Sequence, residues 1–95
     1  MKGYWIAHVK VTDQASYDKY IAGTKAAFEK YNAKPLARGG RYTQFEGEDR
    51  PRNVVLEFAS YEDAVNCYNS SEYKSAREHR IGAGIATIVI VEGIE

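Results

Sequence analysis

The segment from Ile85 to Val91 is apolar at nearly every position. A half-buried strand alternates apolar and polar residues, whereas a strand that is apolar on both sides is typical of burial on both faces. We therefore expect this segment to form a central, buried strand. A chain of 95 residues has few elements with which to cover both faces of a sheet, so this segment constrains the fold more than any other.

The N-terminal third predicts a strand followed by a helix. The residues from Gly3 to Val11 alternate between apolar and more polar side chains, as strands do. Asp13 is placed to cap the helix that follows. Apolar and aromatic side chains then recur every three or four residues as far as Tyr31. This spacing predicts an amphipathic helix of about five turns that ends near Asn32.

Two further strands are expected in the middle of the chain. The stretch from Leu36 to Phe45 reads as one long strand, with a bulge or bend at Gly39 and Gly40. A turn over 47–51 contains both glycine and proline. The residues 53–58 place valine, leucine and phenylalanine on one side, which predicts the next strand.

The region before the last strand predicts a helix with a break. Ser60 and Asp63 have the spacing of a capping box, with aspartate in the usual glutamate position. Asn69 and Glu72 repeat this spacing, so the helix is expected to be interrupted and capped again there. The second helical piece is expected to run to about Arg80.

The order of elements is βαββαβ, which predicts a single α+β domain over residues 1–95 with a ferredoxin-like fold. Right-handed crossovers place both helices on one face of a four-stranded antiparallel sheet. No helix remains for the other face. An uncovered apolar face favours aggregation, and a second sheet packed against it removes the problem. We therefore expect a two-fold homodimer.

Composition narrows the possible partners and location. Thirteen basic and thirteen acidic residues balance and are interleaved, apart from a small basic cluster at Arg50–Arg52. Neither nucleic acid nor an anionic membrane surface is therefore an expected partner. No apolar run approaches the roughly 20 residues of a membrane-spanning helix, and the first residues lack a signal-peptide pattern. Cys67 is the only cysteine. A lone thiol excludes an internal disulfide and fits a reducing cytoplasmic location.

Several segments in order resemble the "domain of unknown function 1330" family of the dimeric α+β barrel superfamily. The departures are minor, such as Ala59 where such proteins often have proline. The resemblance covers nearly the whole chain and is carried by Val11-Thr12-Asp13 with Tyr17 and Tyr20, Leu36-Ala37-Arg38-Gly39-Gly40, Glu46-Gly47, Glu57-Phe58 with Ser60, Tyr68-Asn69-Ser70 with Glu72-Tyr73, Arg80, and Val91-Glu92-Gly93.

The resemblance implies the ferredoxin-like fold and the dimer, and it brings no established activity. Members of the wider superfamily include cofactor-free monooxygenases of antibiotic biosynthesis, isomerases of small lactones and haem-binding dismutases. This likeness is at the level of fold and transfers no catalytic residue.

His8 and Arg38 are the candidate catalytic residues. His8 lies in mid-strand, where an imidazole could act as a general base in a pocket. The favoured alternative is a structural histidine at the dimer interface. Arg38 is followed by two glycines that let a ligand approach, and its guanidinium could stabilise a carboxylate or an enolate. The favoured alternative is an ion pair with Glu57.

A second group of residues is predicted to contribute to ligand binding. Tyr68, Asn69 and Tyr73 lie around the helix break, where free N–H groups could attract an anion. Capping and packing are the favoured alternatives for these residues. Arg80 matches the family resemblance and is preferred to its helix neighbour Arg77. Tyr4, on the same strand face as His8, completes the ligand-binding set.

Two function classes therefore remain open. One is a cofactor-independent enzyme, similar to a monooxygenase or isomerase, acting on a small aromatic or oxo-acid metabolite in a pocket between sheet and helices. The other is a non-catalytic dimeric module that binds a small molecule or has a role in stress. No cofactor is expected, and one cysteine with two histidines gives no metal-binding spacing.

Overall fold

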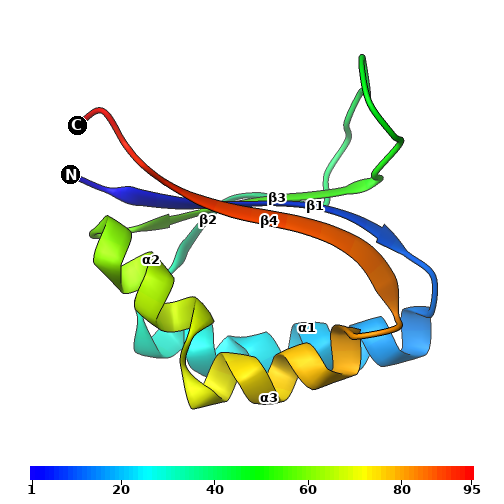
Figure 1. Cartoon of the computed structure of the whole chain (residues 1–95), viewed down its shortest axis with the longest axis horizontal. Helices are drawn as coiled ribbons and strands as arrows, with labels where there is room; N and C mark the ends of the chain where they lie inside the picture. The colour runs from blue at the N-terminus through cyan, green and yellow to red at the C-terminus, as the bar shows by residue number, and fades with distance from the viewer.

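The computed structural model describes residues 1–95 and contains the elements in the predicted order (Figure 1). The four strands form one antiparallel sheet in the order β2-β3-β1-β4, and all helices lie on one side of it. The predicted ferredoxin-like fold is confirmed. The elements are β1 (Gly3–Val11), α1 (Gln14–Lys30), β2 (Lys34–Arg38), β3 (Arg52–Phe58), α2 (Tyr61–Tyr68), α3 (Ser71–Arg80) and β4 (Gly84–Glu92).

Two of the helices begin where their capping residues predict. The Asp13 carboxylate accepts a hydrogen bond from the backbone N–H of Ser16 at the start of α1, at 3.2 Å. The Ser60 hydroxyl accepts one from the backbone N–H of Asp63 at the start of α2, at 3.0 Å. Each cap satisfies an N–H group that has no partner within its helix.

The predicted helix break is present, but Asn69 does not cap the helix that follows it. Ser70 accepts the hydrogen bond from the backbone N–H of Tyr73 at 3.1 Å, while Asn69 ends α2 as its C-cap. The Ser70 hydroxyl also donates to the carbonyl oxygen of Cys67 at 2.6 Å. The buried Ser70 therefore bonds to the end of α2 and to the start of α3, whereas the exposed Asn69 caps only the end of α2.

The core lies between the sheet and the helices and is built around one indole. Trp5 is only 1% exposed. Its ring centroid lies 4.9 Å from that of Tyr73, 5.4 Å from that of Phe28 and 5.6 Å from that of Tyr68. Aromatic pairs at these separations stabilise a core beyond the area they bury. Trp5 thus joins β1 to α1, α2 and α3.

The predicted strand from Leu36 to Phe45 is wrong in its second half. β2 ends at Arg38, and residues 39–51 form a loop that projects from the side of the sheet opposite the helices (Figure 1). The Gly39 N–H still bonds to the Asn53 carbonyl at 2.9 Å, but Gly39 has a φ of 69° that turns the chain out of the ladder. The irregularity in register falls earlier, between Pro35 and Ala37.

The final strand is also placed differently from its prediction. β4 pairs only with β1, so it is an edge strand rather than a central one. In this topology β1 and β3 occupy the centre because each pairs with two neighbours. Alternate β4 side chains reach the core, whereas Ile85, Val89 and Val91 are about half exposed.

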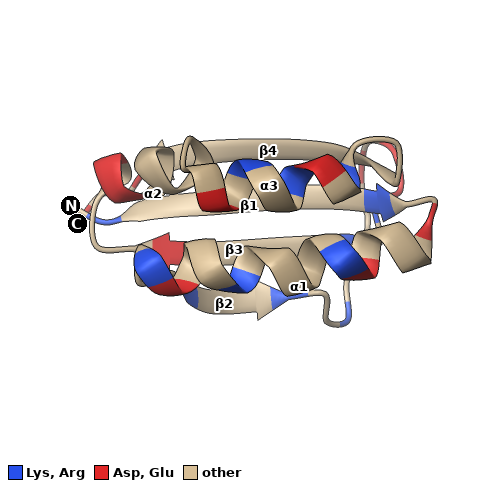
Figure 2. Ribbon diagram, turned by 90° about the horizontal axis from the view of Figure 1, so that it is seen from below, with Lys and Arg blue, Asp and Glu red and all other residues tan.

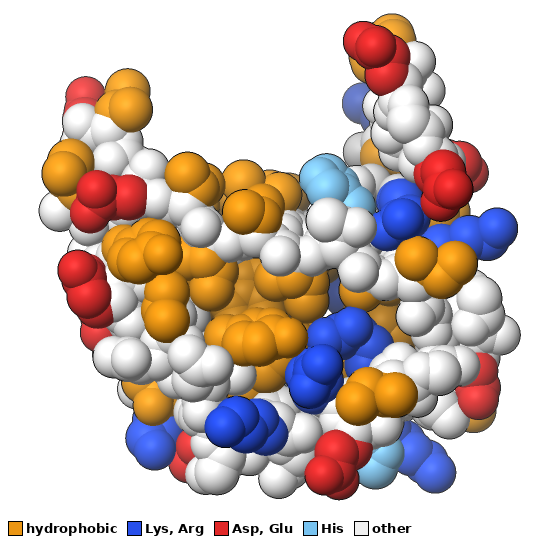
Figure 3. Space-filling model, in the orientation of Figure 1, with side chains coloured by type: hydrophobic (Ala, Val, Ile, Leu, Met, Phe, Trp, Pro, Cys, Tyr) orange, Lys and Arg blue, Asp and Glu red, His pale blue; other side chains and the backbone are white.

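The sheet face away from the helices is uncovered, and we call it the open face. Cross-strand neighbours share a face of a sheet, and the registers of β1, β3 and β4 therefore define this one. In the side view of Figure 3 it forms the hollow along the upper edge of the molecule, between the loop over 39–51 and the chain ends. Its outward residues are Tyr4, Ile6, His8, Asn53, Val55, Glu57, Ile85, Thr87, Val89 and Val91.

The helices pack side by side against the other face, as Figure 2 shows for α1 and α3. A side chain at Gly23 would meet the Cβ of Ala76 at 3.0 Å, so glycine permits the close approach of these helices. Acidic and basic residues are interleaved along the outer surface of both (Figure 2). None of the helices has the length and apolar character required to span a bilayer.

Candidate functional site

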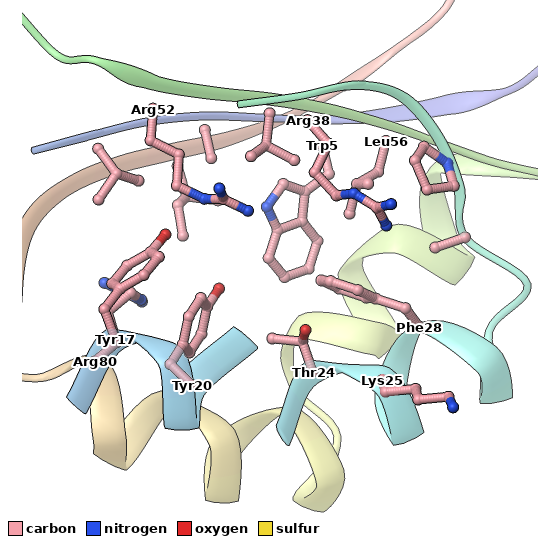
Figure 4. Close-up of a pocket in the computed structure, with 16 residues that line it drawn as sticks. Trp5, Tyr17, Tyr20, Thr24, Lys25, Phe28, Arg38, Arg52, Leu56 and Arg80 are labelled. Atoms are coloured by element: carbon pink, nitrogen blue, oxygen red, sulfur yellow. The ribbon is translucent and has the colours of Figure 1, made fainter. Parts of the chain in front are cut away.

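A cavity of about 150 Å³ lies between α1 and the helix-covered face of the sheet (Figure 4). A dry cavity of about this volume accommodates one benzene-sized ring. Every strand and two helices contribute to its wall. The lining residues are Trp5, Ala7, Val9, Tyr17, Tyr20, Thr24, Lys25, Phe28, Ala33, Pro35, Arg38, Arg52, Val54, Leu56, Arg80 and Ile88.

The wall carries three guanidinium groups and no carboxylate. Arg38 comes from β2, Arg52 from the start of β3 and Arg80 from the end of α3. None of them takes part in any of the four ion pairs of the chain. The Nε atoms of Arg52 and Arg80 are buried without a hydrogen-bond partner. Arginine that is removed from water is normally paired, so the half-buried Arg52 and Arg80 are available to an anion, and the exposed Arg38 has no ion-pair partner either.

Arg52 is held above the cavity by its neighbours. Its guanidinium carbon lies 5.7 Å from the ring centroid of Tyr17, a cation–π arrangement. A Cβ at Gly39 would stand only 2.8 Å from Nη1 of Arg52, so glycine leaves the room that the guanidinium occupies. Figure 4 shows the Arg52 and Arg38 side chains descending from the sheet toward α1.

Arg80 meets a pair of buried phenols. Its guanidinium carbon lies 5.3 Å from the ring centroid of Tyr20, and the hydroxyls of Tyr20 and Tyr73 are hydrogen-bonded at 2.8 Å. Burial raises the pKa of both tyrosines, so each remains a neutral phenol at physiological pH. Burial likewise raises the pKa of Tyr17. The site therefore offers fixed positive charge and neutral hydroxyl groups.

His8 and Arg38 are not brought together. Arg38 lines the cavity, whereas His8 lies on the open face, in register with Asn53 and Thr87. The Nδ2 of Asn53 donates to the Arg50 carbonyl at 3.0 Å, which turns its Oδ1 toward Nδ1 of His8. Because Oδ1 is an acceptor, Nδ1 of His8 carries the proton in this pair. The imidazole is thus fixed on the side of the sheet away from the cavity.

A shallow, open polar recess surrounds that imidazole on the open face. It is lined by His8, Gln44, Glu48, Arg50 and Thr87. Within it, Arg50 donates to the Thr87 hydroxyl at 3.0 Å and pairs with the Glu48 carboxylate at 3.5 Å. Here Arg50 and Glu48 neutralise one another, whereas the arginines of the cavity wall have no carboxylate beside them.

The predicted ion pair between Arg38 and Glu57 does not form. Glu57 pairs instead with Lys2 at 3.0 Å, and the hydroxyl of Tyr4 lies 3.5 Å from its other oxygen. The register explains this outcome, since Glu57 is opposite Tyr4 and Lys34 on the open face. The predicted ligand residue Tyr4 therefore faces away from the cavity with Glu57.

The remaining predicted ligand residues are divided between core and surface. Tyr73 is fully buried, and the ring of Tyr68 packs against it at a centroid distance of 4.9 Å. Asn69 is exposed at the helix break. Among the predicted site residues, only Arg38 and Arg80 line the cavity. Burial raises the pKa of the Cys67 thiol to about 12, which keeps it unreactive.

Sequence reasoning missed Arg52 and the two tyrosines of α1 as site residues. The alternation of side chains along β3 could have identified Arg52. Arg52, Val54, Leu56 and Phe58 are spaced by two residues, so all of them face the helices. Tyr17 and Tyr20 lie in the core stripe of α1, where nothing in the sequence separates a cavity residue from a packed one. No three His, Cys, Asp or Glu side chains are grouped as metal ligands.

Comparisons with known proteins agree with this fold. The family model described as domain of unknown function (DUF1330) matches residues 2–94, so the chain belongs to that family. Among curated proteins, none matches the sequence. A crystal structure of a protein of unknown function from Rhodopseudomonas palustris is 16% identical, with a TM-score of 0.78 over 99% of this chain and 83% of that one.

Two other solved structures have a similar fold. A dimeric protein of unknown function with a ferredoxin-like fold, from Bacteroides fragilis, is 14% identical, with a TM-score of 0.65 over 97% of this chain and 96% of that one. SnoaB from Streptomyces nogalater, a cofactor-independent oxygenase, is 10% identical, with a TM-score of 0.61 over 99% and 94% of the two chains. At these identities the likeness shows the fold alone.

Proposed function

We propose that this member of the DUF1330 family binds a small aromatic or oxo-acid anion in the cavity between α1 and the sheet. The observation that carries the proposal is the presence of Arg38, Arg52 and Arg80 in a wall that has no carboxylate. A guanidinium recognises a carboxylate by two parallel hydrogen bonds. The indole and phenyl rings of Trp5 and Phe28 supply the apolar surface that an aromatic ring requires.

The electrostatics of the cavity favour an anion over a neutral ligand. Arginine stays charged at every physiological pH, and a cation removed from water without a partner is destabilising. A bound carboxylate would provide the missing partner for the buried Nε atoms of Arg52 and Arg80. A ring of benzene size would fill the apolar part of the same 150 Å³ space.

Calorimetric titration with benzoate tests the proposal, and benzamide serves as the neutral ligand of the same shape. We expect benzoate to bind and benzamide to bind at least about tenfold more weakly, as the loss of a charge-assisted hydrogen bond implies. Arg52→Gln should weaken benzoate binding by about tenfold to a hundredfold. Arg77→Gln, an exposed position of α3, is the matched control and should bind like the wild type. Equal binding of benzoate and benzamide would refute the proposal.

A second candidate function is cofactor-independent catalysis of the isomerase or oxygenase kind. The guanidinium groups favour it, because positive charge fixed beside a carbonyl stabilises an enolate as it forms. The cavity lining includes no histidine or carboxylate to accept a proton, so the substrate's proton would pass to water. SnoaB, of similar fold, is a cofactor-independent oxygenase.

Deuterium exchange at the CH₂ group of phenylpyruvate in D₂O measures this activity directly. The C–H bond breaks, the proton passes to solvent, and a deuteron returns to the same carbon, with no oxidant involved. We expect the protein to accelerate the exchange and Arg52→Gln to slow it by about tenfold or more. Exchange at the rate of the buffer alone would remove catalysis from consideration while leaving anion binding intact.

The open face supports the proposal that two copies of the chain form a homodimer. Ile6 and Val55 lie at its centre, and Val89 beside them is half exposed. The projections on either side carry large exposed hydrophobic residues, among them Phe45 at 90% and Ile94 at 96%. A second open face would cover this apolar surface, and each projection would then contact the partner.

A further inference from the structure

The cavity contains more positive charge than one carboxylate would neutralise. Arg38, Arg52 and Arg80 all line a space of about 150 Å³, where Arg52 and Arg80 are half-buried and Arg38 is exposed. Like charges this close repel one another, most strongly where water is excluded. Among the acids of α1 and α3, Glu72 is paired with Lys30, and Glu29 lies 4.0 Å from Lys25, which also lines the cavity. A ligand with a single negative charge would leave at least one guanidinium without a partner.

The guanidinium groups are arranged in two places rather than one. Arg52 and Arg80 lie over the rings of Tyr17 and Tyr20, near the start of α1. Arg38 lies toward Phe28, nearer the end of that helix (Figure 4). In the view of Figure 4 the flat indole of the cavity lies between the Arg52 and Arg38 guanidinium groups.

We propose that the natural ligand is an aromatic dianion with acidic groups at its two ends. This inference rests on the proposed anion binding and adds the class of ligand to it. One acidic group, a carboxylate, pairs with Arg52 and Arg80. The second, a carboxylate or an enolate oxygen, pairs with Arg38. The ring between them stacks against Trp5, which supplies the apolar wall at the middle of the site.

The arrangement gives each arginine a distinct part in recognition. Arg52 and Arg80 have the buried, unpartnered Nε atoms and fix the first acidic group. Arg38 belongs to the exposed edge strand β2 and selects ligands that carry a second one. Gly39, with φ of 69°, follows Arg38 directly, and its missing side chain leaves room for Nη1 of Arg52. The turn at Gly39 therefore lies beside both guanidinium groups.

Calorimetric titration of the wild type with benzoate, isophthalate and terephthalate tests this assignment. We expect at least one diacid to bind about tenfold or more tightly than benzoate, as one added charge-assisted contact implies. Arg38→Gln should bring the ratio of diacid to benzoate affinity close to one. Arg52→Gln should weaken benzoate and the diacid alike, and the control Arg77→Gln should reproduce the wild-type ratio.

The outcomes separate this inference from the proposed function. Diacids that bind no more tightly than benzoate, or an Arg38→Gln variant that keeps the wild-type ratio, would overturn the dianion while anion binding stands. Failure of benzoate and both diacids to bind would overturn both. Circular dichroism of each variant establishes that the fold is retained, so a lost preference reports recognition rather than unfolding.

Discussion

On the helix-covered face of the sheet, Arg38 and Arg52 have no carboxylate partner, whereas on the open face Glu57 is paired with Lys2 and Arg50 with Glu48. The apolar residues show the reverse pattern. Those under the helices are buried around Trp5, while those of the open face are only half covered. The helix-covered face therefore lacks negative charge to pair with its arginines, and the open face lacks a surface to cover its apolar residues.

This difference indicates two different kinds of partner. Unpaired cations beside aromatic rings in a small cavity suit a small anion. A broad apolar surface with its polar groups already paired suits another protein surface, because little charge must lose its water without compensation. If the two partners differ in this way, a substitution on one face should leave the other face's partner bound.

The largest expected effect is the dissociation of the dimer by Val89→Asp. Val89 lies beside Ile6 on the open face and is 50% exposed in the single chain. A dimer would bury two unpaired carboxylates, at about 3–5 kcal/mol for each uncompensated charge. Light scattering at micromolar concentration should therefore show a dimer for the wild type and a monomer for the variant.

The matched control for that experiment is Ile81→Asp. Ile81 is 63% exposed but ends α3 on the helix side of the sheet, so the variant should remain dimeric. Benzoate binding by the Val89→Asp monomer should persist, because the cavity lies on the helix-covered side of the sheet, away from the open face. A Val89→Asp protein that stays dimeric would show that the open face is not the interface.

The next largest effect is the loss of stability in Tyr73→Phe. The Tyr73 hydroxyl is hydrogen-bonded to that of Tyr20 at 2.8 Å in the core. Its removal leaves a buried hydroxyl without that partner, which should lower the free energy of unfolding by about 1–2 kcal/mol. Urea titration measures the change, and Tyr61→Phe, at a 39% exposed position, should change stability by less than about 0.5 kcal/mol.

Arg52→Gln should have a smaller effect on stability than Tyr73→Phe, in the absence of ligand. Removal of a cation that has no ion-pair partner stabilises the fold. Loss of the contact with the Tyr17 ring, worth about 0.5–1 kcal/mol, destabilises it. These effects oppose one another, so we expect a change within about 0.5 kcal/mol in urea titration. A loss of 2 kcal/mol or more would mean that Arg52 serves the fold rather than a ligand.

Much of the fold could be predicted from the sequence because its signals are local. Alternation defined β1 and β3, and the capping residues Asp13 and Ser60 defined the starts of α1 and α2. The errors arose where the outcome depends on distant partners. Whether residues 41–45 extend a strand depends on a neighbouring strand to pair with, and the position of β4 in the sheet depends on the order of all four strands.

The site was less predictable than the fold for the same reason. His8 and Arg38 both belong to strands, but the face that each side chain occupies is set by register with β3, and the bulge between Pro35 and Ala37 shifts that register. A cavity is also a property of packing in three dimensions. Tyr17 and Tyr20 follow the same helical period whether they fill the core or line a hollow in it.

The smallest expected effect concerns the paired charges of the open face and appears as a dependence on pH. The hydrogen bond from Lys2 lowers the pKa of the Glu57 carboxyl below its usual value of 4.5. A group whose pKa is lower in the folded state stabilises that state above its unfolded pKa, and the contribution is lost as the pH falls through the folded value. Glu57 thus adds stability at neutral pH that declines below about pH 4.5.

Glu57→Gln should therefore lower stability slightly at pH 7, and its difference from the wild type should be smaller at pH 3, because the contribution of the carboxylate declines as the pH falls. Urea titrations at the two pH values measure this difference, and Glu62→Gln, an exposed acid of α2, is the control without a Lys2 contact. A Glu57→Gln variant that is equally destabilised at both values would show that the carboxylate charge is not what Lys2 recognises. The Lys2–Glu57 pair would then stabilise the fold through its hydrogen bond alone. The open face and the cavity would in that case differ in which side chains are hydrogen-bonded, and not in whether charge is neutralised.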